Sequence, residues 1–95
     1  MLEIMTTLSA KLTFFIPHAH SLKDKRTVAR GLIDKTRHKY NASVAEIDTQ
    51  EVHQTLTLGI AVVSGEYSHA FNMLDDIIRF MERVADAELV SVFRD

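Results

Sequence analysis

Histidines and carboxylates in three separate stretches are the side chains with which this sequence could do chemistry. His18 and His20 form a His-x-His pair directly after the only proline, and His53 lies between two later apolar runs. Imidazoles combined with carboxylates bind zinc and other divalent metals. The carboxylates available for such a site are those of Asp48, Glu51, Asp86 and Glu88. Because three loops would have to converge on one ion without a compact motif such as H-E-x-x-H, we interpret these as loop residues and expect no metal and no cofactor.

Nucleophilic catalysis has no better support. The sequence has no cysteine and only three isolated glycines, so it lacks a thiol nucleophile, a P-loop, a G-x-S-x-G elbow and a G-x-G-x-x-G turn. Ser21 beside His20 could serve as a nucleophile and its base, but a serine directly before a run of helical periodicity is a typical helix N-cap. We therefore favour a binding protein over an enzyme.

The strongest signal is a concentration of positive charge. Residues 18–41 contain seven of the eleven lysines and arginines and only two carboxylates, a local charge of +5, while the rest of the chain sums to −7. The formal net charge of −2 therefore conceals a polarised molecule. A basic segment of this kind is typical of proteins that bind an anionic partner such as a nucleic acid.

The basic segment coincides with a predicted helix. Residues 4–16 alternate with a period of two, which predicts a long strand with one buried face that Pro17 ends. Apolar side chains at helical spacing then predict a helix over residues 22–39, with Ser21 as its N-cap. Four cations of this helix fall within about 60° of one another and form one ridge on its flank. These RNA-binding candidates are Lys23, Arg26, Arg30 and Arg37.

Two features of this helix leave alternatives open. Lys25 falls toward the apolar side, where it either extends its amine to solvent or pairs with Glu46 or Asp48. The ridge is either a phosphate-binding surface or a solvated face with Asp24 and Asp34 as its internal ionic partners.

The rest of the chain predicts four more elements. They are a strand over 42–48, a strand over 55–64 after a polar hairpin loop at 49–54, an amphipathic helix over 67–84 and a final strand over 88–94. The side chains of the second helix that we expect in the core include Phe71, Leu74, Ile78 and Met81. The pattern does not decide which residues of the last strand face inward.

This order predicts a single α+β domain over residues 1–95, a ferredoxin-like βαββαβ sandwich with sheet order 4-1-3-2 and both helices on one face. The arrangement keeps the long first strand away from a sheet edge. It also places the end of that strand near the hairpin loop and the end of the second helix. The residues expected at this loop end are His18, His20, Lys25, Glu46, Asp48 and His53.

Three segments, IPHAHSLKDKR, YNASVAEID and LGIAVVS, resemble the YlxP-like family of small bacterial proteins of unknown function. The resemblance runs from about Met5 to the end of the chain and implies a ferredoxin-like fold. It also implies a link to ribosomes or RNA, because the family's genes commonly lie beside translation genes. The chain departs from the family pattern at His18, Thr49 and His53, where glycine, histidine and an aromatic residue are usual. The family's usual start falls at Met5, so we expect residues 1–4 to precede the genuine start.

Two functions of different classes follow. The first is an RNA- or ribosome-associated accessory factor that uses the basic helix. The alternative is a homo-oligomeric interaction module that does not bind nucleic acid. In it, either the basic helix binds the acidic half of a neighbouring copy, or the open faces of two sheets meet in a homodimer. The open-face side chains are those of Met5, Thr7, Ser9, Thr13, Phe15, Thr57, Ala61 and Val63. No run approaches the roughly 20 apolar residues of a membrane span, so we expect a cytoplasmic protein with no membrane contact.

Overall fold

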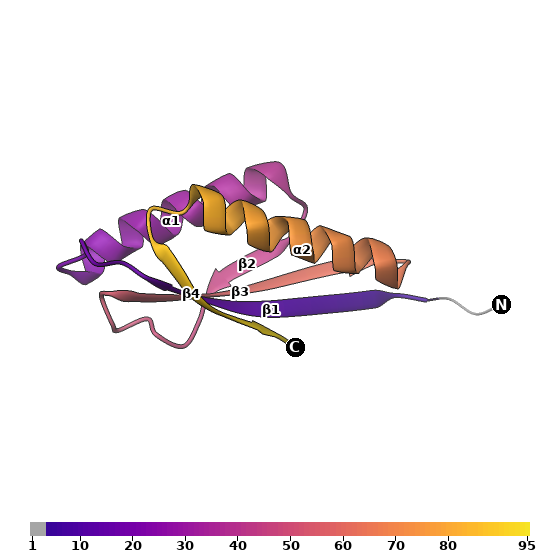
Figure 1. Cartoon of the computed structure of the whole chain (residues 1–95), viewed down its shortest axis with the longest axis horizontal. Coiled ribbons are helices and arrows are strands. Elements are labelled where there is room, and N and C mark those ends of the chain that lie inside the picture. Colours follow the sequence, from indigo (N-terminus) through magenta and orange to yellow (C-terminus); the bar gives the residue numbers. More distant parts are fainter. Residues whose placement is uncertain (1–3) are drawn as a thin grey trace.

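Six elements follow one another in the order strand, helix, strand, strand, helix, strand in the computed structural model, which describes residues 4–95 (Figure 1). The elements are β1 (Thr6–Phe15), α1 (Leu22–Lys39), β2 (Ser43–Glu46), β3 (Thr55–Ser64), α2 (Tyr67–Val84) and β4 (Glu88–Arg94). Both helices, β3 and β4 have the predicted bounds, whereas β1 and β2 are shorter at both ends than predicted. Three of the four residues expected to precede the family's start lie outside the described residues.

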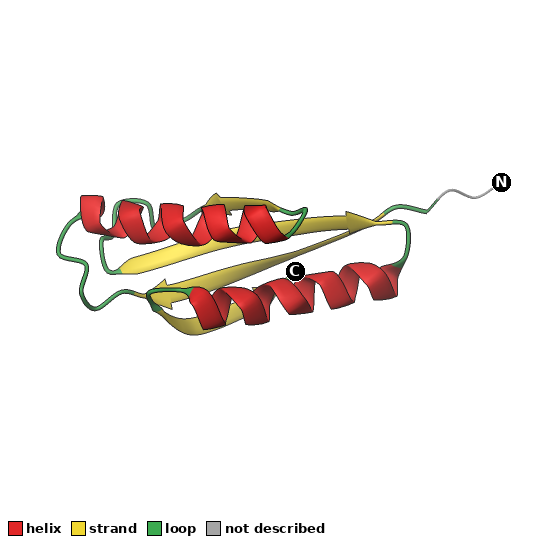
Figure 2. Cartoon of the chain, turned by 90° about the horizontal axis from the view of Figure 1, so that it is seen from above, coloured by secondary structure: helices red, strands yellow, loops and turns green. Residues whose placement is uncertain are grey.

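The four strands form one antiparallel sheet in the order β2-β3-β1-β4, which confirms the predicted topology. The two helices lie side by side on one face of this sheet, α1 toward β2 and β3 and α2 toward β1 and β3 (Figure 2). The long strands β1 and β3 pair along their full length at the centre. The sheet therefore has two edges, β2 on the side of α1 and β4 on the side of α2.

The hydrophobic core lies between the sheet and the helices. Alternate residues of β1 and β3, among them Leu12, Phe14, Leu56 and Leu58, are fully buried against it. Burial of such side chains contributes about 1.5–3 kcal/mol each. The helix residues that meet them are Ala29 and Leu32 of α1 and Ala70, Leu74, Ile77, Ile78, Phe80 and Met81 of α2. None of the helices within residues 4–95 is long and apolar enough to cross a membrane.

One core residue was predicted wrongly. Phe71 is 42% exposed, stacks on Tyr67 with ring centroids 6.3 Å apart, and lies 5.2 Å from the guanidinium of Arg94. It sits at the border of the apolar stripe of α2, on the flank that turns toward the β4 edge. The apolar stripe is therefore wider than the surface that the sheet covers.

A β-bulge in β4 determines which of its residues face the helices. The pairing with β1 shifts between Thr13 and Phe14, so Val90 is an extra residue with no counterpart on β1. Leu89 and Val92 consequently share the helix face although they are three residues apart, and Phe93 faces the open side. A period-two pattern cannot show such a shift.

Candidate nucleic-acid interface

Three of the four ridge cations are exposed and unpaired. Lys23, Arg26 and Arg30 point from the flank of α1, and within residues 4–95 their cationic groups make no hydrogen bond or ion pair. The helix that carries them begins at Ser21, whose hydroxyl accepts from the backbone N–H of Asp24 at 3.0 Å. This confirms the N-cap prediction and fixes where each cation emerges.

The internal ionic partners proposed for the ridge do not engage it. Asp24 instead accepts from the backbone N–H of His20 at 2.9 Å, which completes the cap. Asp34 is exposed and, in the described part of the chain, forms no ion pair with a ridge residue. The three cations are therefore available to an external anion.

Arg37, the fourth candidate, is engaged by the protein itself. Its Nη2 donates to the main-chain carbonyl of Val44 at 2.7 Å. The bond shows that the ridge flank of α1 lies above the outer edge of β2. Arg37 thus differs from the other three in having a partner within the protein, and its role as an RNA-binding candidate stays a prediction.

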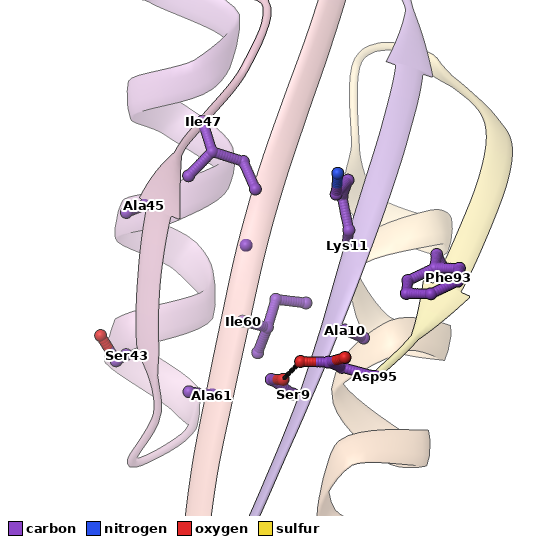
Figure 3. A pocket seen from close by; sticks show the side chains of 11 residues that line it. Ser9, Ala10, Lys11, Ser43, Ala45, Ile47, Ile60, Ala61, Phe93 and Asp95 are labelled. Atoms are coloured by element: carbon purple, nitrogen blue, oxygen red, sulfur yellow. Dashed lines mark hydrogen bonds between the residues drawn. The ribbon is translucent and has the colours of Figure 1, made fainter.

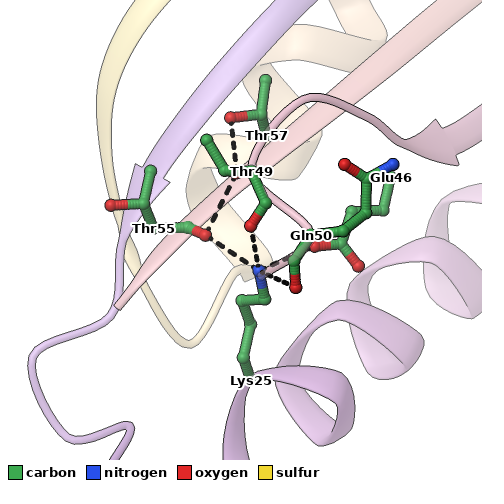
Figure 4. Close-up of polar contacts among 6 residues, drawn as sticks. All are labelled: Lys25, Glu46, Thr49, Gln50, Thr55 and Thr57. Atoms are coloured by element: carbon green, nitrogen blue, oxygen red, sulfur yellow. Dashed lines mark hydrogen bonds and ion pairs between the residues drawn. The ribbon is translucent and has the colours of Figure 1, made fainter. Parts of the chain in front are cut away.

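Lys25 pairs with Glu46 and does not extend its amine to solvent. The lysine is fully buried, and its Nζ lies 2.9 Å from Glu46 Oε2 (Figure 4). It also donates to the carbonyls of Thr49, Gln50 and Thr55 at 2.5 to 3.2 Å. Glu46 Oε2 is itself buried and accepts no hydrogen bond from the described residues, so the ammonium is its compensating charge.

The lysine fixes the loop between β2 and β3 to the first turns of α1. This loop crosses toward the open face, where Thr49 Oγ1 lies 2.9 Å from Thr57 Oγ1 and covers it. Thr57 is consequently buried rather than part of the open surface. Asp48 adopts a left-handed backbone, φ 63°, at the turn into this loop. No pattern in the sequence indicates that these main-chain carbonyls surround Lys25.

The other loop-end residues are divided among separate contacts. His18 Nε2 lies 3.2 Å from Asp86 Oδ2, and Lys11 Nζ lies 2.8 Å from Asp48 Oδ2. His53 is exposed. Among residues 4–95, no three His, Cys, Asp or Glu side chains gather in a way that could hold a metal ion.

A groove of about 500 Å³ crosses the open face of the sheet (Figure 3). Its floor is made of small side chains, with Ser43 and Ala45 on β2 and Gly59 and Ala61 on β3. Phe93, 61% exposed, and Lys11 stand along it on the β4 side. Within residues 4–95, Phe15 and Phe93 are the only exposed aromatic residues on this face. The homodimer contact that we expect on this face stays a prediction.

The fold and the sheet order define a ferredoxin-like α+β protein. Two solved structures share this arrangement: a C-terminal segment of the alpha subunit of aIF2 from Pyrococcus abyssi (TM-score 0.59, 15% identity, 97% of this chain) and the de novo designed ferredoxin-fold protein LFR1 1 (TM-score 0.55, 17% identity, 94% of this chain). The chain spans 51% of the archaeal chain and 82% of the designed one. At these identities the likeness is one of fold alone.

The sequence itself identifies the family. Residues 7–94 match the family described as "Protein of unknown function (DUF503)", and the chain belongs to this family. It is 30% identical over 79 residues to the "Uncharacterized protein YlxP" of Bacillus subtilis (strain 168), which covers 83% of this chain and 86% of the relative. The resemblance seen in the sequence is thus confirmed.

Proposed function

We propose that this protein is an accessory factor that binds the ribosome or another RNA. We also propose that it is not an enzyme. The observation that carries the proposal is the row of unpaired cations Lys23, Arg26 and Arg30 on one exposed flank of α1. Exposed cations that have no internal carboxylate partner contribute their full charge to the binding of phosphates.

The spacing of these cations suits a nucleic-acid backbone. From Lys23 to Arg30 the helix rises about 10 Å. A nucleic-acid strand carries one negative charge per nucleotide, so cations spread over that length can contact more than one phosphate. A rigid helix fixes the positions from which the three side chains extend, so little backbone entropy is lost on binding. The implied proximity of the family's genes to translation genes supports ribosomal RNA as the partner.

Reversal of the ridge charge tests the proposal. Arg26→Glu combined with Arg30→Glu should weaken co-sedimentation with ribosomes and binding to isolated RNA, because both side chains are exposed and neither packs in the core. The slope of log affinity against log salt concentration should fall by roughly 0.7 to 0.9 for each phosphate that the variant no longer neutralises. Circular dichroism should show an unchanged fold.

The control variant carries the same change of net charge on another flank of α1. Lys35→Glu alters an exposed lysine that lies away from the ridge, and in comparison with Arg30→Glu alone it should leave the salt slope close to that of the wild type. If the ridge variant co-sediments like the wild type, or if the wild type does not bind ribosomes or RNA at low salt, the RNA proposal is wrong.

A further inference from the structure

The two edges of the sheet expose main-chain groups on β4 and on β2. Asp95 donates its backbone N–H to Ser9, so the residues of β4 that alternate with it, Val92 and Arg94, direct their main-chain groups outward. Val92 is 42% exposed and Phe93 is 61% exposed. An apolar edge strand with free main-chain groups is a template for pairing with another strand.

The same reasoning applies to β2. Ile47 donates its N–H to Thr57 on β3, so Val44 and Glu46 direct their main-chain groups outward. The bond from Arg37 to the Val44 carbonyl confirms this direction. Each edge therefore has two residues whose main-chain groups point outward, and one inward-bonded residue lies between them.

These outward residues occupy the same rows of the sheet. Reading across the four strands, one row consists of Arg94, Ala10, Ile60 and Val44. The next two rows join Phe93 to Ala45 and Val92 to Glu46. If β4 of one copy lies beside β2 of the next copy, Arg94 meets Val44 and Val92 meets Glu46 without any shift along the strands. Because β2 and β4 are antiparallel, the new pairing is antiparallel as well.

The helices above the two edges carry opposite charges at matching intervals. The ridge of α1 has Arg37, Arg30 and Arg26, separated by seven and four residues. The β4-side flank of α2 has Asp75 and Glu82, followed by Asp86 just past the helix, again separated by seven and four. The two helices run in opposite directions. Across a junction between two copies, the cations from Arg37 back to Arg26 and the carboxylates from Asp75 on to Asp86 therefore follow one another in the same direction.

The sheet rows set the relative height of these two series. Arg37 bonds to Val44, and Asp75 bonds to Arg94 at 2.7 Å, so both side chains belong to the row that joins Arg94 to Val44. At the junction Arg37 therefore faces Asp75, whose carboxylate already pairs with Arg79 and Arg94 of its own copy. Arg30 faces Glu82, which has no ion-pair partner in the described residues and is the free acidic counterpart. The charge complementarity follows from the register of the strands.

The layers also have matching widths. Four strands about 4.8 Å apart occupy about 19 Å, and two packed helices occupy about 16–20 Å. Addition of another copy thus continues both the sheet and the helix layer without a gap. In addition, Phe93 comes to lie beside Ala45 of the next copy, at the rim of the groove with the small side chains.

We propose that this protein self-associates head to tail, with β4 of one copy added to β2 of the next and the acidic flank of α2 set against the basic ridge of α1. Arg37 then releases the Val44 carbonyl, which accepts from the main chain of β4 of the neighbour, and the new ion pair across the junction is that of Arg30 with Glu82. The contact is heterologous, so it builds a ring or an open filament rather than a two-fold dimer. It does not depend on RNA binding.

Cross-linking through introduced cysteines tests this register, because the natural sequence has none. Phe93 and Ala45 of adjacent copies form a pair without main-chain hydrogen bonds, with Cα atoms about 4.5 Å apart, within the range of a disulfide. A mixture of the Phe93→Cys and Ala45→Cys proteins should yield the mixed disulfide dimer as the main product. Phe93→Cys mixed with Val63→Cys, an exposed position on the open face of β3 beyond the end of β2, should yield little. Circular dichroism checks that each variant is folded.

Charge reversal gives a second readout. Glu82→Arg should abolish the rise of mass with concentration that we expect for the wild type in sedimentation velocity at low salt. Asp76→Arg, an equal charge change on the exposed side of α2, should not abolish it. A wild type that stays monomeric at every concentration overturns the proposal, as does a dominant Phe93→Cys homodimer, which would indicate a two-fold β4 contact. Failure of RNA binding leaves all these results unaffected, so the two proposals are tested separately.

Discussion

Replacement of Lys25 by methionine removes a buried charge while keeping most of its apolar stem. In the wild type, Lys25 Nζ compensates the buried Glu46 Oε2 at 2.9 Å and donates to three main-chain carbonyls, two in the loop before β3 and one at its first residue. Lys25→Met leaves that carboxylate without a cation. Removal of one member of a buried ion pair costs about 3–5 kcal/mol. We expect a loss of about 3–5 kcal/mol, a large share of the roughly 5–15 kcal/mol of a typical domain.

Equilibrium unfolding in urea, followed by far-UV circular dichroism, measures this loss. The matched control is Lys35→Met on the exposed side of the same helix, which should change the free energy of unfolding by less than about 0.5 kcal/mol. Adding Glu46→Gln to Lys25→Met should restore part of the stability, because the uncompensated carboxylate is then gone. A loss below about 1 kcal/mol for Lys25→Met would show that the ammonium does not hold the loop as we infer.

Two other predictions concern the core and the histidines. Leu74→Ala should cost about 2–5 kcal/mol, and Phe71→Ala clearly less, because Leu74 is 2% and Phe71 42% exposed; equal losses in urea unfolding would contradict this difference in burial. A chelator such as EDTA should leave the melting temperature unchanged, because among the described residues Asp86 is the one carboxylate that His18 contacts and no cluster could hold a metal ion. A clear fall in the melting temperature would reveal a bound metal.

The fold was predictable because its signals are local. The serine cap and the helical periodicity of residues 22–39 fix α1, and Pro17 ends the alternation that defines β1. The bulge at Val90 was not predictable, because it depends on pairing with Thr13 and Phe14. The exposure of Phe71 also depends on tertiary structure, since it follows from the extent of the sheet beneath α2 rather than from the helical pattern.

The candidate site was predictable to the extent that it lies on a single helix. Angular position alone placed Lys23, Arg26 and Arg30 together, and the structure keeps them there. Arg37 satisfies the same angular rule, yet its bond to Val44 arises only because the edge of β2 lies below it. The helical pattern places Lys25 on the apolar side, but its carbonyl acceptors come from an irregular loop whose sequence has no period.

Arg30 is the residue at which the two proposals meet. Phosphates and the carboxylate of Glu82 of a neighbouring copy are both anions, and they would occupy the same flank of α1. RNA and self-association therefore exclude each other there, and saturating RNA should lower the average mass of an assembly. High salt weakens both contacts, so salt dependence alone does not separate them. The Glu82→Arg variant separates the two contacts, because it removes the anion of the neighbouring copy and leaves Lys23, Arg26 and Arg30 intact for RNA.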